Sequence, residues 1–546
     1  MVSVEINKSE LLRLIGKELS DEEIVNTLFN LKCEANIIGD QMTCEITPDR
    51  IDMCCVEGIA RAMAQYLELP TPKVEILPSD ESLVVESVKA RPYIRTAIVK
   101  GLEIDETCIL NLMQLQEKLH ATIGRNRKKV AVGIHDISHV RGPFTYKEIK
   151  PSEIKFIPLG EKREMNLAEI LLEHPKGKEY RECLVGFEKY PILLDAKSNV
   201  LSFPPIINGE LTRVTTKTKD LLIDVTGTNL KAVENTLNII ISALAMRGGK
   251  IYEMMIRNAN ESVRSPNFEP RAVRIKFEKP SMLLGIQLNP EDIISSLERM
   301  GYESTVVGNE IDVFVPPYRS DVFSDVDIIE DIAIGYGYSN IIPELPKLAT
   351  QGGLSKVESI SRDVRAILAG FGAQEILNFV LTTPTDNFDK MNAPRSEFIE
   401  IENPVSQEYT ILRTWLIPSL VRLLGKNKHR AYPQKIFEVG DCVVRDGKSC
   451  TFSKTIRKAA IVITHDSANL TEAKSVVEGF LKALGINYMI ASYEHPSFIP
   501  SRCGVVIVNG EEVGFFGEIH PAVLETFDID KPVIAAEFCL NDLFGF

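Results

Sequence analysis

Residues 316–338 read PPYRSDVFSDVDIIEDIAIGYGY and place five acids within eleven residues. The acids run directly into an apolar segment whose spacing predicts an amphipathic helix with Ser324 as its N-cap. Asp327, Glu330 and Asp331 are spaced i, i+3 and i+4, so we expect them to share one face of that helix. Like charges at this spacing repel one another, and the stretch therefore requires a positive neighbour.

Spacing alone leaves three interpretations of this acidic stretch open. Acids in a first helical turn are stabilised by the helix dipole by roughly 0.3–1 kcal/mol, so a solvated cap could suffice. A hard divalent cation such as magnesium takes oxygen ligands of this kind. A basic partner surface would neutralise the charges as well. Asp321, in the turn after Arg319, is near enough in sequence to fold back toward the same face.

The composition predicts a cytoplasmic globular protein. Of its 546 residues, 44% are hydrophobic and 25% are charged, and no apolar run of about 18 residues could cross a membrane. Ten cysteines without a C-x-x-C pair favour reduced thiols over a zinc site. A net charge of −14 argues against a surface coated by nucleic acid, although basic patches occur at 124–129 (GRNRKK) and 425–430 (GKNKHR).

Pro-rich stretches predict joints between domains at 67–82, 258–270 and 341–353. We expect four domains, at 1–82, 83–262, 268–345 and 350–546. In the second, β-branched runs such as DLLIDVTG alternate with helical patterns, which is typical of a mixed α/β domain. The last favours an α+β domain with an antiparallel sheet backed by helices. The predicted fold class is therefore multidomain α+β and mixed α/β.

Two shorter segments give more specific structural predictions. Ser20 and Glu23 have the spacing of a capping box, which predicts a helix beginning at Asp21. Segment 271–340 predicts a strand, a helix, a strand pair around VVGNEIDVFVP and then the acidic helix.

Motifs of the common nucleotide and hydrolase sites are absent from the sequence. The chain has no G-x-x-x-x-G-K-[ST] P-loop, no G-x-G-x-x-G after a strand, no H-E-x-x-H and no G-x-S-x-G. For a chain of this length, either the chemistry uses an unfamiliar arrangement or part of it lies on another chain.

The acidic stretch resembles a known family. Its patterns P-x-x-R-x-D, D-[IL]-[IV]-E-[DE]-[IV]-A and Y-G-Y-x-x-I are similar to the small magnesium-bearing domain of phenylalanyl-tRNA synthetase β subunits. The same resemblance is carried by TPDRIDMCCVEGIA (47–60), ENPVSQEYTILRTWLIPSLV (402–421), KIFEVGDC (435–442), HPSFIPSR (495–502) and GFFGEIHP (514–521). In the first of these, Asp49-Arg50 replaces a plain Asn-Arg. KLHATIGRNRKKVAVGIHD (118–136) and LSFPPIINGELTRVT (201–215) resemble the archaeal and eukaryotic-cytosolic branch.

For the acidic stretch, the resemblance implies a magnesium site that is shared with a partner subunit. The matching motif positions are Asp321, Asp327, Glu330 and Asp331. Asp325 falls outside the pattern. Such a site would help to fix a surface of the α subunit and would carry no step of the reaction.

The resemblance implies an aminoacyl-tRNA synthetase, a ligase that attaches phenylalanine to its tRNA with ATP. In this family the α subunit carries the ATP-binding and amino-acid site, and the usual assembly is a heterotetramer of two α and two β subunits. The expected partners are the α subunit and tRNA(Phe), with phenylalanine and ATP bound through the complex. Domain 350–546 would resemble a class II synthetase catalytic domain that has lost its active residues and serves as an interface.

The resemblance also implies that segment 90–257 is an editing domain, which hydrolyses tyrosine wrongly attached to the tRNA. A phenylalanine pocket cannot strongly reject a ring that adds only a hydroxyl, so a second site that hydrogen-bonds this hydroxyl is useful. The candidate residues are Ser202, Glu210, Asp224 and Thr226. For each, the alternative is a strand-end or turn residue that bonds its own backbone. His120 and His135 are expected to be structural.

The absence of a Ser-His-Asp order favours attack by water on an oriented ester. Two functions from other classes remain open. One is a non-catalytic RNA-binding or scaffold protein built from the same modules. The other is a free-standing hydrolase of mischarged tRNA, which would not need segments 271–340 and 354–546.

Overall fold

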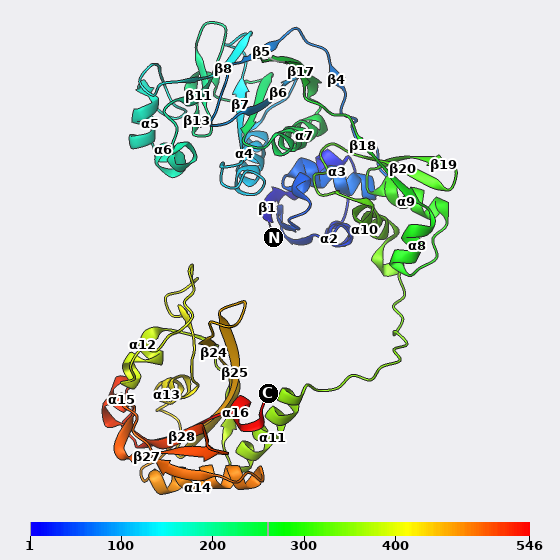
Figure 1. Cartoon of the computed structure of the whole chain (residues 1–546). Helices are drawn as coiled ribbons and strands as arrows, with labels where there is room; N and C mark the ends of the chain where they lie inside the picture. Colours follow the sequence, from blue (N-terminus) through cyan, green and yellow to red (C-terminus); the bar gives the residue numbers. More distant parts are fainter. Residues whose placement is uncertain (1, 259–260) are drawn as a thin grey trace. The chain divides into compact units, whose positions relative to one another are not determined.

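The computed structural model describes residues 2–258 and 261–546. The chain forms two compact units, Met1–Leu345 and Pro346–Phe546 (Figure 1). Both mix helices with several sheets, which confirms a multidomain mixed α/β architecture. Among the described residues, no helix has the length and apolar character needed to cross a lipid bilayer.

The first unit begins with a three-stranded antiparallel sheet of order β1-β3-β2. Its strands are β1 (Val2–Asn7), β2 (Glu34–Ile38) and β3 (Gln41–Ile46), and its helices are α1 (Lys8–Ile15), α2 (Asp21–Asn30) and α3 (Val56–Tyr66). The side chain of Ser20 accepts from the Glu23 amide and that of Glu23 accepts from the Ser20 amide, so the predicted capping box is confirmed.

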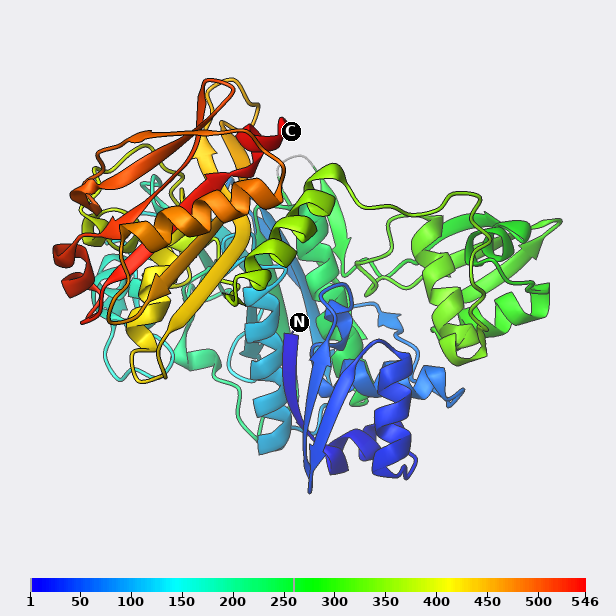
Figure 2. The ribbon, with the colours of Figure 1, turned by 90° about the horizontal axis from the view of Figure 1, so that it is seen from below.

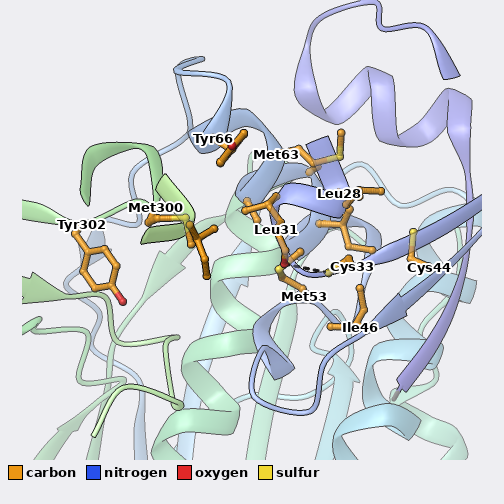
Figure 3. Packing of buried hydrophobic residues seen from close by; sticks show 14 of the residues in the cluster. Leu28, Leu31, Cys33, Cys44, Ile46, Met53, Met63, Tyr66, Met300 and Tyr302 are labelled. Carbon is orange, nitrogen blue, oxygen red and sulfur yellow. Dashed lines mark hydrogen bonds between the residues drawn. The ribbon is translucent and has the colours of Figure 1, made fainter. Parts of the chain in front are cut away.

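The small segment after residue 270 has the predicted elements in the predicted order, with one additional helix, α8 (Glu278–Leu284), before the predicted one. The predicted elements are β18 (Arg271–Lys276), α9 (Pro290–Arg299), β19 (Glu303–Val307), β20 (Glu310–Val315) and α10 (Asp325–Tyr336). It shares one hydrophobic core with the N-terminal sheet: Met63 and Tyr66 of α3 belong to the same buried cluster as Met300 and Tyr302 (Figure 3). The segments expected as the first and third domains are therefore packed together.

Between these two segments lies a pair of sheets that pack face to face. One has order β4-β15-β6-β14-β7 and the other β13-β12-β11-β8-β5-β16-β17. The first contains β4 (Ile76–Leu77), β6 (Tyr93–Lys100), β7 (Val130–Asp136), β14 (Leu221–Gly227) and β15 (Lys250–Tyr252). The second contains β5 (Ser82–Val85), β8 (Phe144–Ile149), β11 (Tyr190–Leu194), β12 (Val200–Phe203), β13 (Ile207–Asn208), β16 (Met254–Arg257) and β17 (Ser262–Ser265).

Helices cover the outer face of the five-stranded sheet. α4 (Glu106–Ala121) and α7 (Leu230–Met246) bury their apolar faces against β6, β7 and β14 in one core cluster. On the other side, Ile98 and Leu222 pack against Tyr146 and Leu193 of the seven-stranded sheet. β14 pairs with β6 and β7 on its two sides, so all seven of its residues are buried. The short elements β9 (Lys155–Phe156), β10 (Met165–Asn166), α5 (Leu167–Glu173) and α6 (Pro175–Tyr180) complete this region.

The second unit is built on a seven-stranded sheet of order β21-β24-β25-β29-β28-β27-β26. All neighbouring pairs are antiparallel except β21 with β24. Its strands are β21 (Gln374–Glu375), β24 (Gln434–Arg445), β25 (Ser453–Thr464), β26 (Met489–Ser492), β27 (Phe498–Val508), β28 (Glu511–Ile519) and β29 (Val533–Cys539). β22 (Leu381–Thr382) and β23 (Ile411–Leu412) form a separate two-stranded sheet.

Helices cover both faces of this sheet because residues along its strands alternate between two cores. Ile461 of β25 packs with α11 (Lys356–Gly370), α14 (Leu470–Ala483) and α16 (Leu540–Phe544), whereas Val462 packs with α13 (Ile417–Lys426) and α15 (Pro521–Thr526). Figure 2 shows α11 and α14 beside each other across one face. The remaining helix is α12 (Pro384–Asn387). The expected antiparallel sheet backed by helices is confirmed.

Candidate functional site

The acidic helix begins where the sequence predicts. Ser324 is the N-cap of α10, and the Asp327 carboxylate accepts from the backbone N–H of Ser324 at 2.7 Å and of Phe323 at 2.8 Å. Desolvation raises the pKa of Asp327, but these two amide hydrogen bonds outweigh it and hold the pKa below its usual value. Asp327 is thus a capping residue.

Asp321 and Asp331 share one buried arginine. Arg319 donates from Nε and Nη2 to Asp321 at 2.9 and 2.7 Å, and from Nη2 to Asp331 at 2.6 Å. The Tyr302 hydroxyl also donates to Asp331, and burial raises the pKa of this phenol well above its usual value. Asp321 does fold back toward the helix. Asp331 is buried and pairs with Arg319, whereas the Glu330 side chain is 51% exposed, so the two acids have different surroundings.

The other acids pair with lysines from distant parts of the first unit. Lys32 donates to Glu330 at 2.8 Å and to Asp49 at 3.0 Å. Lys279 donates to Asp325. The positive neighbour that the acidic stretch requires is therefore supplied by the chain itself.

The four predicted metal ligands do not form a metal site within this chain. Their oxygen donors suit a hard cation. However, two of them are committed to Arg319, and nowhere in residues 2–258 and 261–546 do three or more His, Cys, Asp or Glu side chains gather in a way that could hold a metal ion. A magnesium site here would require ligands or rearrangement from a second chain.

A cavity of about 520 Å³ lies between the five-stranded sheet, α4 and the β12–β13 connection. Three of the four predicted editing residues line it: Ser202 of β12 and Asp224 and Thr226 of β14. Glu210 is not on the cavity wall, which corrects its grouping with the other three. Its carboxylate accepts from the Gly160 amide at 2.8 Å and pairs with Arg213 at 3.1 Å.

The polar groups of the cavity wall differ in how they are satisfied. The Thr226 hydroxyl accepts from Arg91 Nε at 3.1 Å, and its carbonyl accepts from Arg91 Nη2 at 2.6 Å. Ser202 is 2% exposed, yet its Oγ has no hydrogen-bond partner among the described residues. Leaving a buried hydroxyl unpaired costs about 1–3 kcal/mol. The cavity therefore keeps a free polar group that a ligand could bind.

Sequence reasoning missed the partner of Asp224. His135 Nε2 lies 2.8 Å from Asp224 Oδ2, and its Nδ1 lies 2.8 Å from Thr212 Oγ1. The one sequence signal is Gly133 inside a β-branched run, since a strand glycine often marks a close approach of another group. His120 is structural as expected, because its Nε2 accepts from the Val132 amide at 2.9 Å.

The basic patch at 124–129 lies beside the cavity. Some of its charged side chains point inward and others are exposed. Three successive residues, Arg125, Asn126 and Arg127, have φ of 48°, 53° and 63°. This left-handed turn directs Arg127 inward, where its guanidinium donates to the Ile206 carbonyl at 3.0 Å and lines the cavity. Arg125 and Lys128 remain exposed.

Comparison with known families assigns most of the chain. A model described as "Phenylalanyl tRNA synthetase beta chain CLM domain" matches residues 341–540, "tRNA synthetase B5 domain" matches 273–338 and "B3/4 domain" matches 97–242. The second of these contains the acidic helix, and the third contains most of the cavity wall.

Relatives of nearly the same length support the same assignment. The chain is 42% identical over 545 residues to the phenylalanine–tRNA ligase β subunit of Methanocaldococcus jannaschii, covering 98% of this chain and 99% of the relative. It is 41% identical to that of Pyrococcus furiosus, covering 100% of both. Among solved structures, an N-terminal fragment of the phenylalanyl-tRNA synthetase β subunit from Pyrococcus horikoshii is 37% identical with a TM-score of 0.59. That match covers 61% of this chain and 99% of the fragment.

Proposed function

The chain belongs to the family of phenylalanine–tRNA ligase β subunits, and from that premise we propose that it supports two reactions on one tRNA. It is a subunit of an aminoacyl-tRNA synthetase, a ligase of protein biosynthesis. With an α subunit, in a cytoplasmic assembly of two α and two β chains, it attaches phenylalanine to tRNA(Phe) with ATP. Through its own cavity, it hydrolyses tyrosyl-tRNA that was formed in error.

The second unit supports placing the synthetic site on the α subunit. Two pairs of its charged residues neutralise each other: Arg413 donates to Glu438 at 2.7 Å, and Lys458 donates to Glu537 at 2.9 Å. Charges that are paired in a buried site are not free to bind ATP. The pairing fits a class II-like domain that has lost its active residues and serves as an interface.

The observation that carries the editing proposal is the cavity wall with its free Ser202 hydroxyl and its Asp224 carboxylate. A site built to hydrogen-bond a substrate hydroxyl rejects the analogue that lacks it, because the polar groups of the site are then left unpaired. Such a cavity binds a tyrosyl ester and disfavours a phenylalanyl ester, which is the selectivity that correction of tyrosyl-tRNA requires.

The geometry favours water rather than Ser202 as the nucleophile. An activated serine needs a base within hydrogen-bond reach. Ser202 Oγ has no such partner among the described residues, and His135 is occupied by Asp224 and Thr212. The wall residues orient the ester and a water molecule. Water adds to the ester carbonyl, the bond to the ribose oxygen breaks, and tyrosine and uncharged tRNA leave.

The test compares the chain alone with the chain bound to its α subunit. We expect phenylalanine charging only in the complex and hydrolysis of tyrosyl-tRNA wherever this chain is present. Charging by the isolated chain would contradict the division of labour. A complex that charges normally but never hydrolyses tyrosyl-tRNA would contradict editing, and a chain that affects neither reaction would favour a scaffold.

Magnesium at α10 is proposed as a property of the assembled enzyme. Asp327 and Glu330 are the two predicted ligands that are free of Arg319, and the Glu330 side chain is 51% exposed. A partner surface that adds ligands there could complete a site. Metal analysis after dialysis should find bound magnesium in the complex and none in the isolated chain, and Glu330→Gln should lower the bound amount. Equal metal content in both samples would argue against a shared site.

A further inference from the structure

A buried histidine stands directly behind the carboxylate of the cavity. His135 is 0% exposed, and its two ring nitrogens each lie 2.8 Å from an oxygen, Asp224 Oδ2 on one side and Thr212 Oγ1 on the other. Asp224 and Thr212 line the cavity, whereas His135 does not. His135 can therefore influence a bound ligand only through these two residues.

The contact between His135 and Asp224 is possible because a glycine, Gly133, lies opposite Asp224 in the strand register. β7 and β14 are antiparallel, with Gly133 opposite Asp224 and His135 two residues further along the same face. A Cβ on Gly133 would stand 2.0 Å from Asp224 Oδ2 and 2.7 Å from His135 Nε2. Because glycine has no Cβ, the carboxylate and the imidazole meet over its backbone.

The hydrogen bonds among His135, Asp224 and Thr212 determine which oxygen of Asp224 is available to a ligand in the cavity. Thr212 Oγ1 lies 3.3 Å from the Gly209 carbonyl and 3.5 Å from the Leu201 carbonyl, and both carbonyls can only accept. A hydroxyl that donates to either carbonyl can accept from His135 Nδ1–H. On the other side of the ring, Nε2 occupies Asp224 Oδ2. Asp224 Oδ1 has no hydrogen-bond partner in residues 2–258 and 261–546, so it remains an acceptor at the cavity.

We propose that His135, anchored by Thr212, is a positioning residue that makes this cavity selective for a substrate hydroxyl. By binding Oδ2 it holds Asp224 so that Oδ1 accepts from a phenolic O–H, a donor that a phenylalanyl ester lacks. The inference rests on the proposed editing function and adds a residue that does not touch the substrate. Without the imidazole, Asp224 can rotate, and its acceptor no longer has a fixed place.

Two substitutions of His135 distinguish the hydrogen bond to Asp224 from the hydrogen bond to Thr212. In His135→Gln, the side-chain amide can still reach the position of Nε2 and donate to Asp224. In His135→Asn, the shorter amide lies near the position of Nδ1 and reaches only Thr212. The measurement is kcat/KM for hydrolysis of tyrosyl-tRNA and of phenylalanyl-tRNA by the complete complex. We expect His135→Asn to lower the ratio of the two by about tenfold, the scale of one hydrogen bond, and His135→Gln to restore most of it.

A matched control is His120→Asn. His120 is buried in the same region and bonds the Val132 amide of β7, but it has no contact with Asp224. It should lower the melting temperature without changing the tyrosyl to phenylalanyl ratio. Phenylalanine charging by each complex reports whether a variant still folds and assembles.

The outcomes separate this inference from the proposed function. If the parent complex does not hydrolyse tyrosyl-tRNA, the editing proposal fails and this one fails with it. Suppose that the parent complex hydrolyses tyrosyl-tRNA and that both His135 variants keep the parent ratio of tyrosyl to phenylalanyl hydrolysis. Only the positioning role is then overturned. The same holds if both His135 variants and His120→Asn lose this ratio equally. A lower ratio in His135→Asn alone supports the role.

Discussion

Around α10, each of five carboxylates within eleven residues has a partner in the same chain: a guanidinium, an ammonium, a phenol or a backbone amide. The cavity wall also carries five charged residues, but one of its buried hydroxyls, that of Ser202, has no partner among the described residues. Every carboxylate of the acidic stretch is paired within the chain, although Arg319 Nη1 has no hydrogen-bond partner among the described residues. On the cavity wall, by contrast, two groups, Ser202 Oγ and Arg127 Nε, are buried without a partner among the described residues.

A ligand is expected where a buried polar group lacks a partner. Burying a polar group is tolerated when it is hydrogen-bonded. Carboxylates that are paired within the chain therefore stabilise the fold and need no ligand to account for them. A buried group that stays unpaired costs stability, and a ligand that bonds it recovers this cost.

Breaking the acidic cluster should have the largest effect. Arg319→Ala would leave the buried Asp331 and the partly buried Asp321 without their cation, and removing one partner of a buried ion pair costs about 3–5 kcal/mol. Chemical denaturation of the isolated chain would measure this loss, through the transition assigned to the first unit.

Arg274→Ala is the matched control for that loss. Arg274 also binds an aspartate through two nitrogens, Asp312 at 2.7 and 2.8 Å, but its side chain is 55% exposed. An exposed pair contributes at most about 1 kcal/mol. Equal losses for the two arginines would mean that the burial of the acidic cluster does not matter.

Removing the cavity carboxylate should come next. Asp224→Ala deletes the acceptor of the wall, and a hydrogen bond to a charged group contributes about 1.5–3 kcal/mol. Hydrolysis of tyrosyl-tRNA by the complex should therefore fall by about 100-fold, and tyrosyl-tRNA should accumulate during charging with tyrosine. Glu210→Gln, outside the wall, should change hydrolysis by less than about twofold. The reverse ranking would return Glu210 to the site.

Two hydroxyls of the same wall should respond with opposite sign. Ser202→Ala removes an unpaired buried hydroxyl, so the free energy of unfolding should stay the same or rise by about 1 kcal/mol while hydrolysis falls. Thr226→Val takes away the acceptor of Arg91 Nε and should cost about 1–3 kcal/mol. Denaturation curves of both variants measure these changes in the free energy of unfolding. A stability loss for Ser202→Ala as large as that for Thr226→Val would show that Ser202 has a structural partner.

Local patterns predicted local structure well. The N-cap of α10 at Ser324 and the capping box at Ser20 depend on residues a few positions apart, and both are confirmed. In segment 271–340 the predicted elements occur in the predicted order, but helix α8 was not predicted. Ser202, Asp224 and Thr226 line one cavity, because strands β12 and β14 bring them together.

Contacts between distant residues were beyond such patterns. Lys32 meets Glu330 across 298 positions, and His135 meets Asp224 across 89. Asp331 is paired with Arg319 and Tyr302, and helical spacing alone gave neither partner. Glu210 was grouped by sequence proximity, but its carboxylate turns to the Gly160 amide. In each case a residue that is distant in the sequence determines the surroundings of the side chain. The periodicity of a helix or strand carries no information about such a partner.

The smallest effect separates capping from metal binding at α10 and depends on pH. Asp327→Ala removes an N-terminal cap and should cost about 1 kcal/mol at neutral pH. Because amide hydrogen bonds hold the pKa of Asp327 below its usual value, its contribution is present above the unfolded pKa of about 3.9 and is lost as the pH falls through the folded pKa. The parent and the variant should therefore differ by a constant amount between about pH 5 and 7 and converge below about pH 4. Unfolding of the isolated chain, followed with and without a chelator, measures both. A difference that disappears with chelator at neutral pH would mean that Asp327 stabilises this chain through a bound metal, whereas a difference that depends on pH alone identifies it as a cap.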